Sequence, residues 1–131
     1  MRVLLDTQVW LWLVTASERL GPESRVLLDD GRNDVLLSSA STWEIAIKYG
    51  LGKLPLPDPP DRYVPEQMRL GGVEPLPVLH SHALHVASLQ DHHRDPFDRI
   101  LVAQAQVEGL PLASADRRLS AYDVEILDAT R

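Results

Sequence analysis

Short apolar runs alternate with longer amphipathic segments along the chain. The short runs have the length and composition of buried β-strands. They occupy residues 3–5, 35–37, 73–78, 110–113 and 124–127. Pro75 and Pro77 place the run at 73–78 on an edge of the sheet, because proline cannot donate to a strand ladder.

The amphipathic segments between these runs are predicted helices. They lie at residues 8–14, 23–30, 41–49, 61–70, 81–89 and 95–108, with one helical turn at 117–120. In the segment 81–89 the residues expected to be buried are Leu84, Val86, Ala87 and Leu89. Strands that alternate with helices are typical of α/β proteins. We therefore expect one domain, residues 1–131, with a mostly parallel sheet covered by helices on both faces.

Composition narrows the class of protein. Hydrophobic residues make up 44% of the chain and charged residues 24%, as in ordinary globular proteins. The absence of cysteine excludes a disulfide framework and a thiolate metal site. The uncharged apolar run at 9–14 is too short to cross a membrane, and we expect a cytoplasmic protein.

The net charge of −6 argues against a protein that coats nucleic acid electrostatically. An excess of acid also fits a site that gathers carboxylates around divalent cations, because the ions reverse the local charge. Composition does not separate these two interpretations.

Four acidic residues stand at equivalent places in the strand–helix pattern. Asp6 and Asp116 follow predicted strands, whereas Asp98 and Glu44 lie in the first turns of predicted helices. Ligands of open α/β sheets bind beyond the carboxyl ends of the strands, so these side chains are candidates for one site. Carboxylates crowded there repel one another, and divalent cations relieve the repulsion. A donor set of oxygens alone favours Mg²⁺ or Mn²⁺, and two such ions can hold a phosphodiester and activate a water.

Each acid also has a purely structural interpretation. Asp6 can cap a helix, Asp98 is favoured by the helix dipole, and Asp116 suits a turn. Glu44 can pair with Lys48 one helical turn further on, although its apolar neighbours favour burial. For any acid taken singly, the sequence leaves both interpretations open.

Several blocks of the sequence resemble PIN-domain ribonucleases of the VapC toxin type. They are residues 4–12, 38–48, 51–54 and 92–105, with 114–116 and 122–124. The motifs Trp43-Glu44-Ile45 and Asp95-Pro96-Phe97-Asp98-Arg99 are the most specific. The resemblance covers nearly the whole chain, from residue 3 to about residue 127.

The resemblance implies a PIN-type three-layer α/β/α sandwich. It implies Mg²⁺- or Mn²⁺-dependent endonucleolytic cleavage of RNA that leaves a 5′-phosphate and a 3′-hydroxyl. The family's four acids carry over to Asp6, Glu44, Asp98 and Asp116, with Asp6 and Asp98 as the firmest metal ligands. A cognate VapB-type antitoxin that blocks the metal site and a second copy in a homodimer are the implied partners.

Polar and basic residues near the acids are candidates for substrate binding. They are Thr7, Lys48, Arg99, Ser114 and Arg117. Thr7 and Ser114 are small polar neighbours of the acids in the resemblance, and the basic side chains can hold RNA phosphates. For any single basic residue, an ordinary surface salt bridge is the simpler interpretation.

Five histidines lie between residues 80 and 93, namely His80, His82, His85, His92 and His93. His82 and His85 have a spacing that can bind metal on a helix, but no cysteine or acid pair completes a zinc site. We therefore expect these histidines to face solvent or a partner. Asp95 is first of all a helix cap, with a role at the acidic site as the alternative.

Other functions are tested by the residues around Asp6. A haloacid-type phosphotransferase needs a second acid two residues later, where this chain has Gln8. A receiver domain also needs an acid pair there and a lysine after its last strand, and this chain has neither. A non-catalytic or weakly catalytic module that binds an antitoxin remains an alternative to the nuclease, although the intact acids weigh against it.

Overall fold

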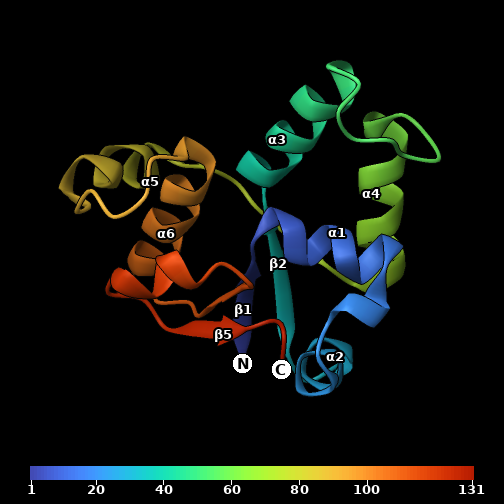
Figure 1. Cartoon of the computed structure of the whole chain (residues 1–131), viewed down its shortest axis with the longest axis horizontal. Helices are drawn as coiled ribbons and strands as arrows, with labels where there is room; N and C mark the ends of the chain where they lie inside the picture. Colours follow the sequence, from blue (N-terminus) through green and yellow to red (C-terminus); the bar gives the residue numbers. More distant parts are fainter.

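The computed structural model describes residues 1–131 and contains one five-stranded sheet. The strands are β1 (Arg2–Leu5), β2 (Asp34–Ser38), β3 (Glu74–Leu76), β4 (Leu112–Ser114) and β5 (Ile126–Asp128). Their order is β3-β2-β1-β4-β5, and every neighbouring pair is parallel (Figure 1). The predicted parallel sheet is confirmed, with β3 on an edge as Pro75 within it requires.

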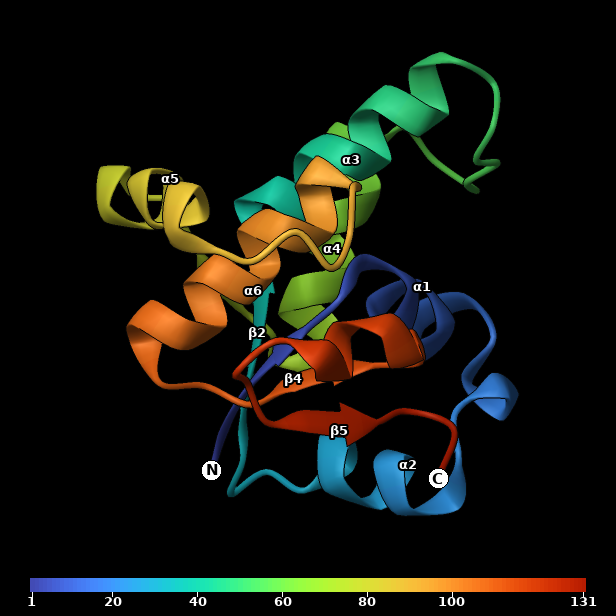
Figure 2. The ribbon, with the colours of Figure 1, turned by 60° about the vertical axis from the view of Figure 1, so that its left-hand side comes forward.

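Six α-helices connect the strands. They are α1 (Thr7–Thr15), α2 (Pro22–Asp29), α3 (Ser39–Gly50), α4 (Pro60–Gly71), α5 (His80–His85) and α6 (Pro96–Glu108). Short 3₁₀ turns occupy Ser17–Arg19, Val86–Ser88 and Arg117–Ala121. Figures 1 and 2 show α5 and α6 on one side of the sheet and α1, α2 and α4 on the other. None of the helices combines the length and the apolar character needed to span a membrane.

The central strands β1 and β2 carry unbroken apolar runs, at residues 3–5 and 35–37, because both faces of the sheet are covered. Val3 and Leu5 point into a core that includes Trp10 of α1, whereas Leu4 between them packs toward Leu101 of α6. Successive side chains of a strand point to opposite faces, so one short run serves both cores. This two-sided burial explains why the sequence shows unbroken apolar runs rather than an alternation.

Local capping signals set the helices that carry acids. Asp6 Oδ1 accepts a hydrogen bond of 2.7 Å from the Val9 N–H and caps α1. Asp95 Oδ1 accepts one of 2.9 Å from the Phe97 N–H and caps α6, which ends at Gly109 with a φ of +66°. Helix α3 begins at Ser39, two residues before its predicted start, because Ser38 at the end of β2 caps it.

The prediction for the segment 81–89 was wrong for Leu84 and Ala87, whereas Leu89 is partly buried against the core. Helix α5 ends at His85 and continues as a 3₁₀ turn, so the helical spacing assumed over nine residues does not hold. Leu84 is 74% exposed and Ala87 is exposed, whereas His82 is fully buried. The ring of His82 satisfies part of its polarity locally, because Nδ1 accepts a hydrogen bond from the Leu79 N–H.

Candidate active site

The order of the strands defines a switch point between β1 and β4. From β1 the chain continues to β2 on one side, whereas β4 and β5 lie on the other side. Ligands of open α/β sheets bind in the crevice that such a switch creates at the carboxyl ends of the strands. Asp6 directly follows β1 and its N–H donates to the Ala113 carbonyl on β4 at 3.0 Å. Asp116 follows β4 two residues after its end, so the switch point has a carboxylate on each side.

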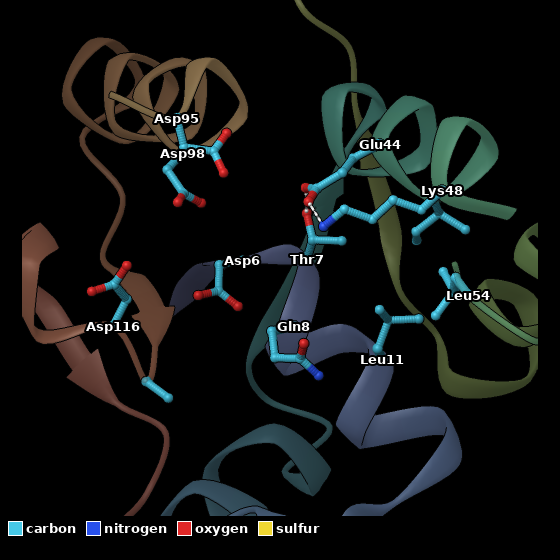
Figure 3. A pocket seen from close by; sticks show the side chains of 12 residues that line it. Asp6, Thr7, Gln8, Leu11, Glu44, Lys48, Leu54, Asp95, Asp98 and Asp116 are labelled. Atoms are coloured by element: carbon cyan, nitrogen blue, oxygen red, sulfur yellow. Dashed lines mark hydrogen bonds and ion pairs between the residues drawn. The ribbon is translucent and has the colours of Figure 1, made fainter. Parts of the chain in front are cut away.

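The four acids singled out by the sequence line one pocket at this edge of the sheet. The pocket has a volume of about 350 Å³, and its lining includes Asp6, Glu44, Asp98 and Asp116 (Figure 3). Each acid comes from a different part of the chain: the ends of β1 and β4, and helices α3 and α6. The lining also contains Thr7, Lys48 and Asp95. Residues separated by up to 110 positions therefore share one cavity.

Asp6 is buried and held by hydrogen bonds. Ser114 Oγ donates to Asp6 Oδ2, while Asp6 Oδ1 caps α1. Burial raises the pKa of the Asp6 carboxyl, and its hydrogen bonds offset part of that effect. The Ser114 hydroxyl also accepts a hydrogen bond from the Asp116 N–H at 3.0 Å, so it links the two acids of the switch point.

Glu44 is fixed by neighbours on α1 and α3. The Thr7 hydroxyl lies 2.8 Å from Glu44 Oε1, to which it donates, and 2.9 Å from Ser41 Oγ. Lys48 Nζ lies 2.6 Å from Glu44 Oε2, in the pair expected from their spacing. Glu44 is buried, whereas the Lys48 side chain is 51% exposed, so the lysine reaches the site from its solvent side.

Asp98 is the acid with the least compensation. Burial, followed by the charge of Asp95, raises the pKa of the Asp98 carboxyl from 3.8 to about 6. The negative charges of Asp6 and Glu44 act in the same direction, and His93 acts against it. Asp98 forms no ion pair with a lysine or an arginine. The pocket thus holds more negative charge than its own basic residues balance.

Asp116 is paired with a basic side chain. Arg118 Nε and Nη2 donate to Asp116 Oδ1 and Oδ2 at 3.0 and 2.9 Å. These hydrogen bonds are the main reason that the pKa of the Asp116 carboxyl falls to about 2. The Arg118 side chain is mostly exposed, and exposed pairs of this kind contribute little stability. Asp116 is therefore ionised and can exchange its arginine for another cation.

The structural and the chemical interpretations of the acids are compatible, because the same side chains have local structural roles and line the pocket. Asp6 caps α1, Glu44 pairs with Lys48, and Asp116 caps the 3₁₀ turn after β4. All three nevertheless line the same pocket as Asp98. Capping uses an oxygen at the start of a helix, which is the end that faces the carboxyl edge of a parallel sheet. The capping role of Asp6 and Asp116 therefore places their side chains at the edge of the sheet where the pocket lies.

The remaining substrate-binding candidates are distributed differently. Lys48 and Thr7 line the pocket, and Ser114 lies behind Asp6. Arg117 is exposed beside a neighbouring hollow that also contains Asp116. Arg99 does not line the pocket, and its guanidinium donates to the chain itself, to carbonyl groups between residues 86 and 93 and to a tyrosine hydroxyl.

Sequence reasoning missed His93. The expectation that the histidines face solvent or a partner is wrong for His93, whose side chain is only 5% exposed, as it is for His82. His93 Nε2 lies 3.1 Å from Asp116 Oδ2 and 3.3 Å from Asp98 Oδ2. Its position two residues before the cap of α6 is a local signal. The sequence nevertheless did not distinguish His93 from the other histidines among the five between residues 80 and 93.

The donors of the pocket fit a divalent cation. They are carboxylate oxygens, which suit Mg²⁺ and Mn²⁺ better than softer metals. Mutual repulsion is visible in the pKa of Asp98, which neighbouring acids help to raise. A cation among these carboxylates would offset that repulsion, so the charge and the donor chemistry of the pocket both favour a cation.

Comparisons with known proteins place the chain in a family. A family model described as PIN domain matches residues 3–125. Ribonuclease VapC16 from Mycobacterium tuberculosis (strain ATCC 25618 / H37Rv) is 56% identical over 63 residues. That match covers 48% of this chain and 45% of the relative, less than half of its length.

Solved structures share the fold over the whole chain. VapBC2 from Rickettsia felis, bound to a DNA fragment from its promoter, has a TM-score of 0.70 at 14% identity, covering 97% of this chain and 98% of that one. VapBC-1 from nontypeable Haemophilus influenzae has a TM-score of 0.67 at 18% identity and covers 100% of both chains. The fold expected from the sequence resemblance is confirmed, and the chain belongs to the PIN domain family.

Proposed function

We propose that this chain is a divalent-metal-dependent endoribonuclease and the toxin of a VapBC-type toxin–antitoxin pair. The observation that carries the proposal is the convergence of Asp6, Glu44, Asp98 and Asp116 on one pocket at the switch point of the sheet. The similarity to a ribonuclease of the VapC type and to VapBC complexes supports the same activity.

The acids divide into ligands and supports in this proposal. Asp6, Asp98 and Asp116 hold Mg²⁺ or Mn²⁺, and Glu44 completes the set directly or through water. When bound, the cation supplies Lewis-acid activation of the phosphodiester and of the attacking water. Ser114 and Thr7 keep the carboxylates of Asp6 and Glu44 oriented through their hydroxyl groups.

The reaction is the hydrolysis of an RNA phosphodiester. The water oxygen forms a bond to phosphorus, and the bond between phosphorus and the 3′ oxygen breaks. The leaving oxygen takes up a proton, so the products carry a 5′-phosphate and a 3′-hydroxyl. Lys48, with its exposed end at the pocket, and Arg117 beside it bind phosphates of the substrate. These local basic groups offset the net charge of −6 where the RNA lies.

The proposed partners follow from the relatives. The two solved relatives named above are VapBC complexes, and we propose a VapB-type antitoxin that covers the acidic pocket of this chain. A homodimer and a cytoplasmic location, where the RNA substrate lies, are part of the same proposal.

The decisive experiment is cleavage of RNA by the purified protein. We expect cleavage with Mg²⁺ or Mn²⁺, none with EDTA, and new 5′ ends that can be ligated without phosphorylation. Asp6→Asn and Asp98→Ala abolish the cleavage. Asp61→Asn, an exposed acid in the first turn of α4, is the matched control and cleaves as the wild type does.

Two results would overturn the nuclease proposal. One is cleavage that persists in EDTA or in the Asp98→Ala variant, because a contaminating nuclease then explains it. The other is a protein that captures an antitoxin but cuts no RNA with either metal, which establishes the non-catalytic module instead. Induction in cells separates the two functions as well, because only the nuclease loses growth arrest with Asp6→Asn.

A further inference from the structure

His93 joins two of the acids, and the proposed mechanism gives it no role. The residue lies in the connection before α6, and its ring is buried between the start of that helix and the end of β4. Its Nε2 is within hydrogen-bonding distance of one oxygen of Asp116 and close to one oxygen of Asp98, at 3.1 and 3.3 Å. One possible metal-binding atom from each of His93, Asp98 and Asp116 lies within 4.8 Å of the other two.

The hydrogen bond at the other ring nitrogen, Nδ1, determines which nitrogen of His93 carries the proton. The Asp95 N–H donates a hydrogen bond of 3.0 Å to His93 Nδ1, so this nitrogen presents a lone pair. A neutral imidazole with an acceptor at Nδ1 carries its proton at Nε2. Nε2 therefore donates to Asp116, with an oxygen of Asp98 close by at 3.3 Å, and has no lone pair for a metal ion. The ring is a hydrogen-bond donor between two ligands rather than a ligand itself.

Arg99 holds the connection that carries His93 through hydrogen bonds to backbone carbonyls. Arg99 Nη1 donates to the carbonyls of Gln90 and His93 at 3.0 and 3.4 Å, and Nη2 donates to the Val86 carbonyl at 3.3 Å. Tyr122, after the last 3₁₀ turn, receives a further hydrogen bond from Arg99 Nη1 at 3.2 Å. A guanidinium used in this way holds the backbone of His93 in place, which keeps the imidazole directed at the acids.

We propose that His93 is a positioning residue of the carboxylate site, where its Nε2–H holds Asp98 of α6 beside Asp116, which follows β4. The carboxylates of Asp98 and Asp116 repel each other because both lie close to the same histidine nitrogen. A hydrogen-bond donor between them lowers the free-energy cost of keeping them together before a cation binds. Donors that orient metal ligands typically change metal affinity 10- to 100-fold when they are removed. This inference rests on the proposed function, because it assumes that the two acids bind a cation.

The test measures Mn²⁺ binding without RNA, by titration calorimetry on the full chain. His93→Ala removes the donor, and His93→Asn has an amide that reaches only the place of Nδ1. His93→Gln has an amide nitrogen that reaches the place of Nε2. We expect His93→Ala and His93→Asn to weaken Mn²⁺ binding at least about tenfold, and His93→Gln to stay within about threefold of the wild type. His92→Ala, in an exposed neighbour on the same connection, is the control and binds Mn²⁺ as the wild type does.

Cleavage kinetics separate positioning from a general loss of structure. For His93→Ala we expect a higher Mn²⁺ requirement but an unchanged KM for RNA once the metal saturates. The inference is overturned if folded His93→Ala binds Mn²⁺ as tightly as the wild type, or if His93→Gln is as weak as His93→Ala. Failure of the proposed function looks different, because the wild type itself then shows no Mn²⁺ binding that depends on Asp98.

Discussion

The carboxylates of the pocket differ in how their charge is balanced. Asp116 is paired with Arg118 and Glu44 with Lys48, whereas Asp98 has no lysine or arginine partner. The pKa of Asp98 is about 6 and that of Asp116 about 2, although both are aspartates at one pocket. The folded protein therefore keeps one poorly compensated charge at neutral pH, which a bound cation would neutralise.

Replacing Asp98 with asparagine stabilises the metal-free protein. A carboxyl whose pKa is higher in the folded than in the unfolded chain lowers the free energy of unfolding as pH rises through about 6. The full penalty is present above that pH, and the shift sets its upper limit at about 3 kcal/mol. We expect Asp98→Asn to gain about 1–3 kcal/mol at pH 7.5 in EDTA, and much less near pH 4, where Asp98 is protonated in the folded chain and only partly ionised in the unfolded chain.

Urea unfolding at the two pH values measures this difference. Asp61→Asn is the control, because Asp61 is also a first-turn acid of a helix but is exposed. Its variant stays within about 0.5 kcal/mol of the wild type at both pH values. A gain for Asp98→Asn that is equally large at pH 4 would show that electrostatics do not cause it.

Elements were predictable where their signals are local. Asp6 and Asp95 cap the helices that follow them, as the sequence indicated. The four acids could be assigned to one edge because their places relative to strands and helices are also local features. The burial of His82 and His93 was not predictable, because it depends on which distant segments pack against them.

The resemblance added what local patterns do not contain. Helix spacing gave Glu44 an ordinary surface pair with Lys48, and both the pair and the position in the pocket are present.

Arg99 was a candidate for RNA binding because it follows an acid of the site, but the direction of a long side chain is set by tertiary contacts. In the structure its guanidinium is directed at carbonyls of its own chain.

The cap of α6 can be separated from the charge of its capping residue. Asp95 caps the helix, and its negative charge also helps to raise the pKa of Asp98. Asp95→Ala and Asp95→Ser both remove the charge, but only serine keeps an oxygen for the Phe97 N–H. We expect the serine variant to be more stable than the alanine variant by about 1 kcal/mol in thermal or urea unfolding. Equal stability of the two would show that the cap contributes nothing to the fold.

At the scale of the whole molecule, the pocket exists only in the folded chain. Its acids come from the ends of two strands and from two helices, and the sheet order brings them to one edge. An unfolded chain has the same residues but no such site. A cation that binds the pocket therefore binds the native state alone, and its binding free energy adds to the free energy of unfolding.

We consequently expect Mg²⁺ to stabilise the protein and to remove the advantage of Asp98→Asn over the wild type. At a concentration of 100 times its Kd, Mg²⁺ adds about 2.7 kcal/mol to the wild type, or roughly 10 °C in Tm for a chain of this size. Asp98→Asn gains little from Mg²⁺, because it lacks a ligand of the site. The variant is thus the more stable protein in EDTA but loses that advantage at saturating Mg²⁺, and NaCl of equal ionic strength does not replace Mg²⁺. Parallel upward shifts of both proteins in thermal unfolding would contradict a site built on Asp98, because they would mean that Mg²⁺ binds elsewhere.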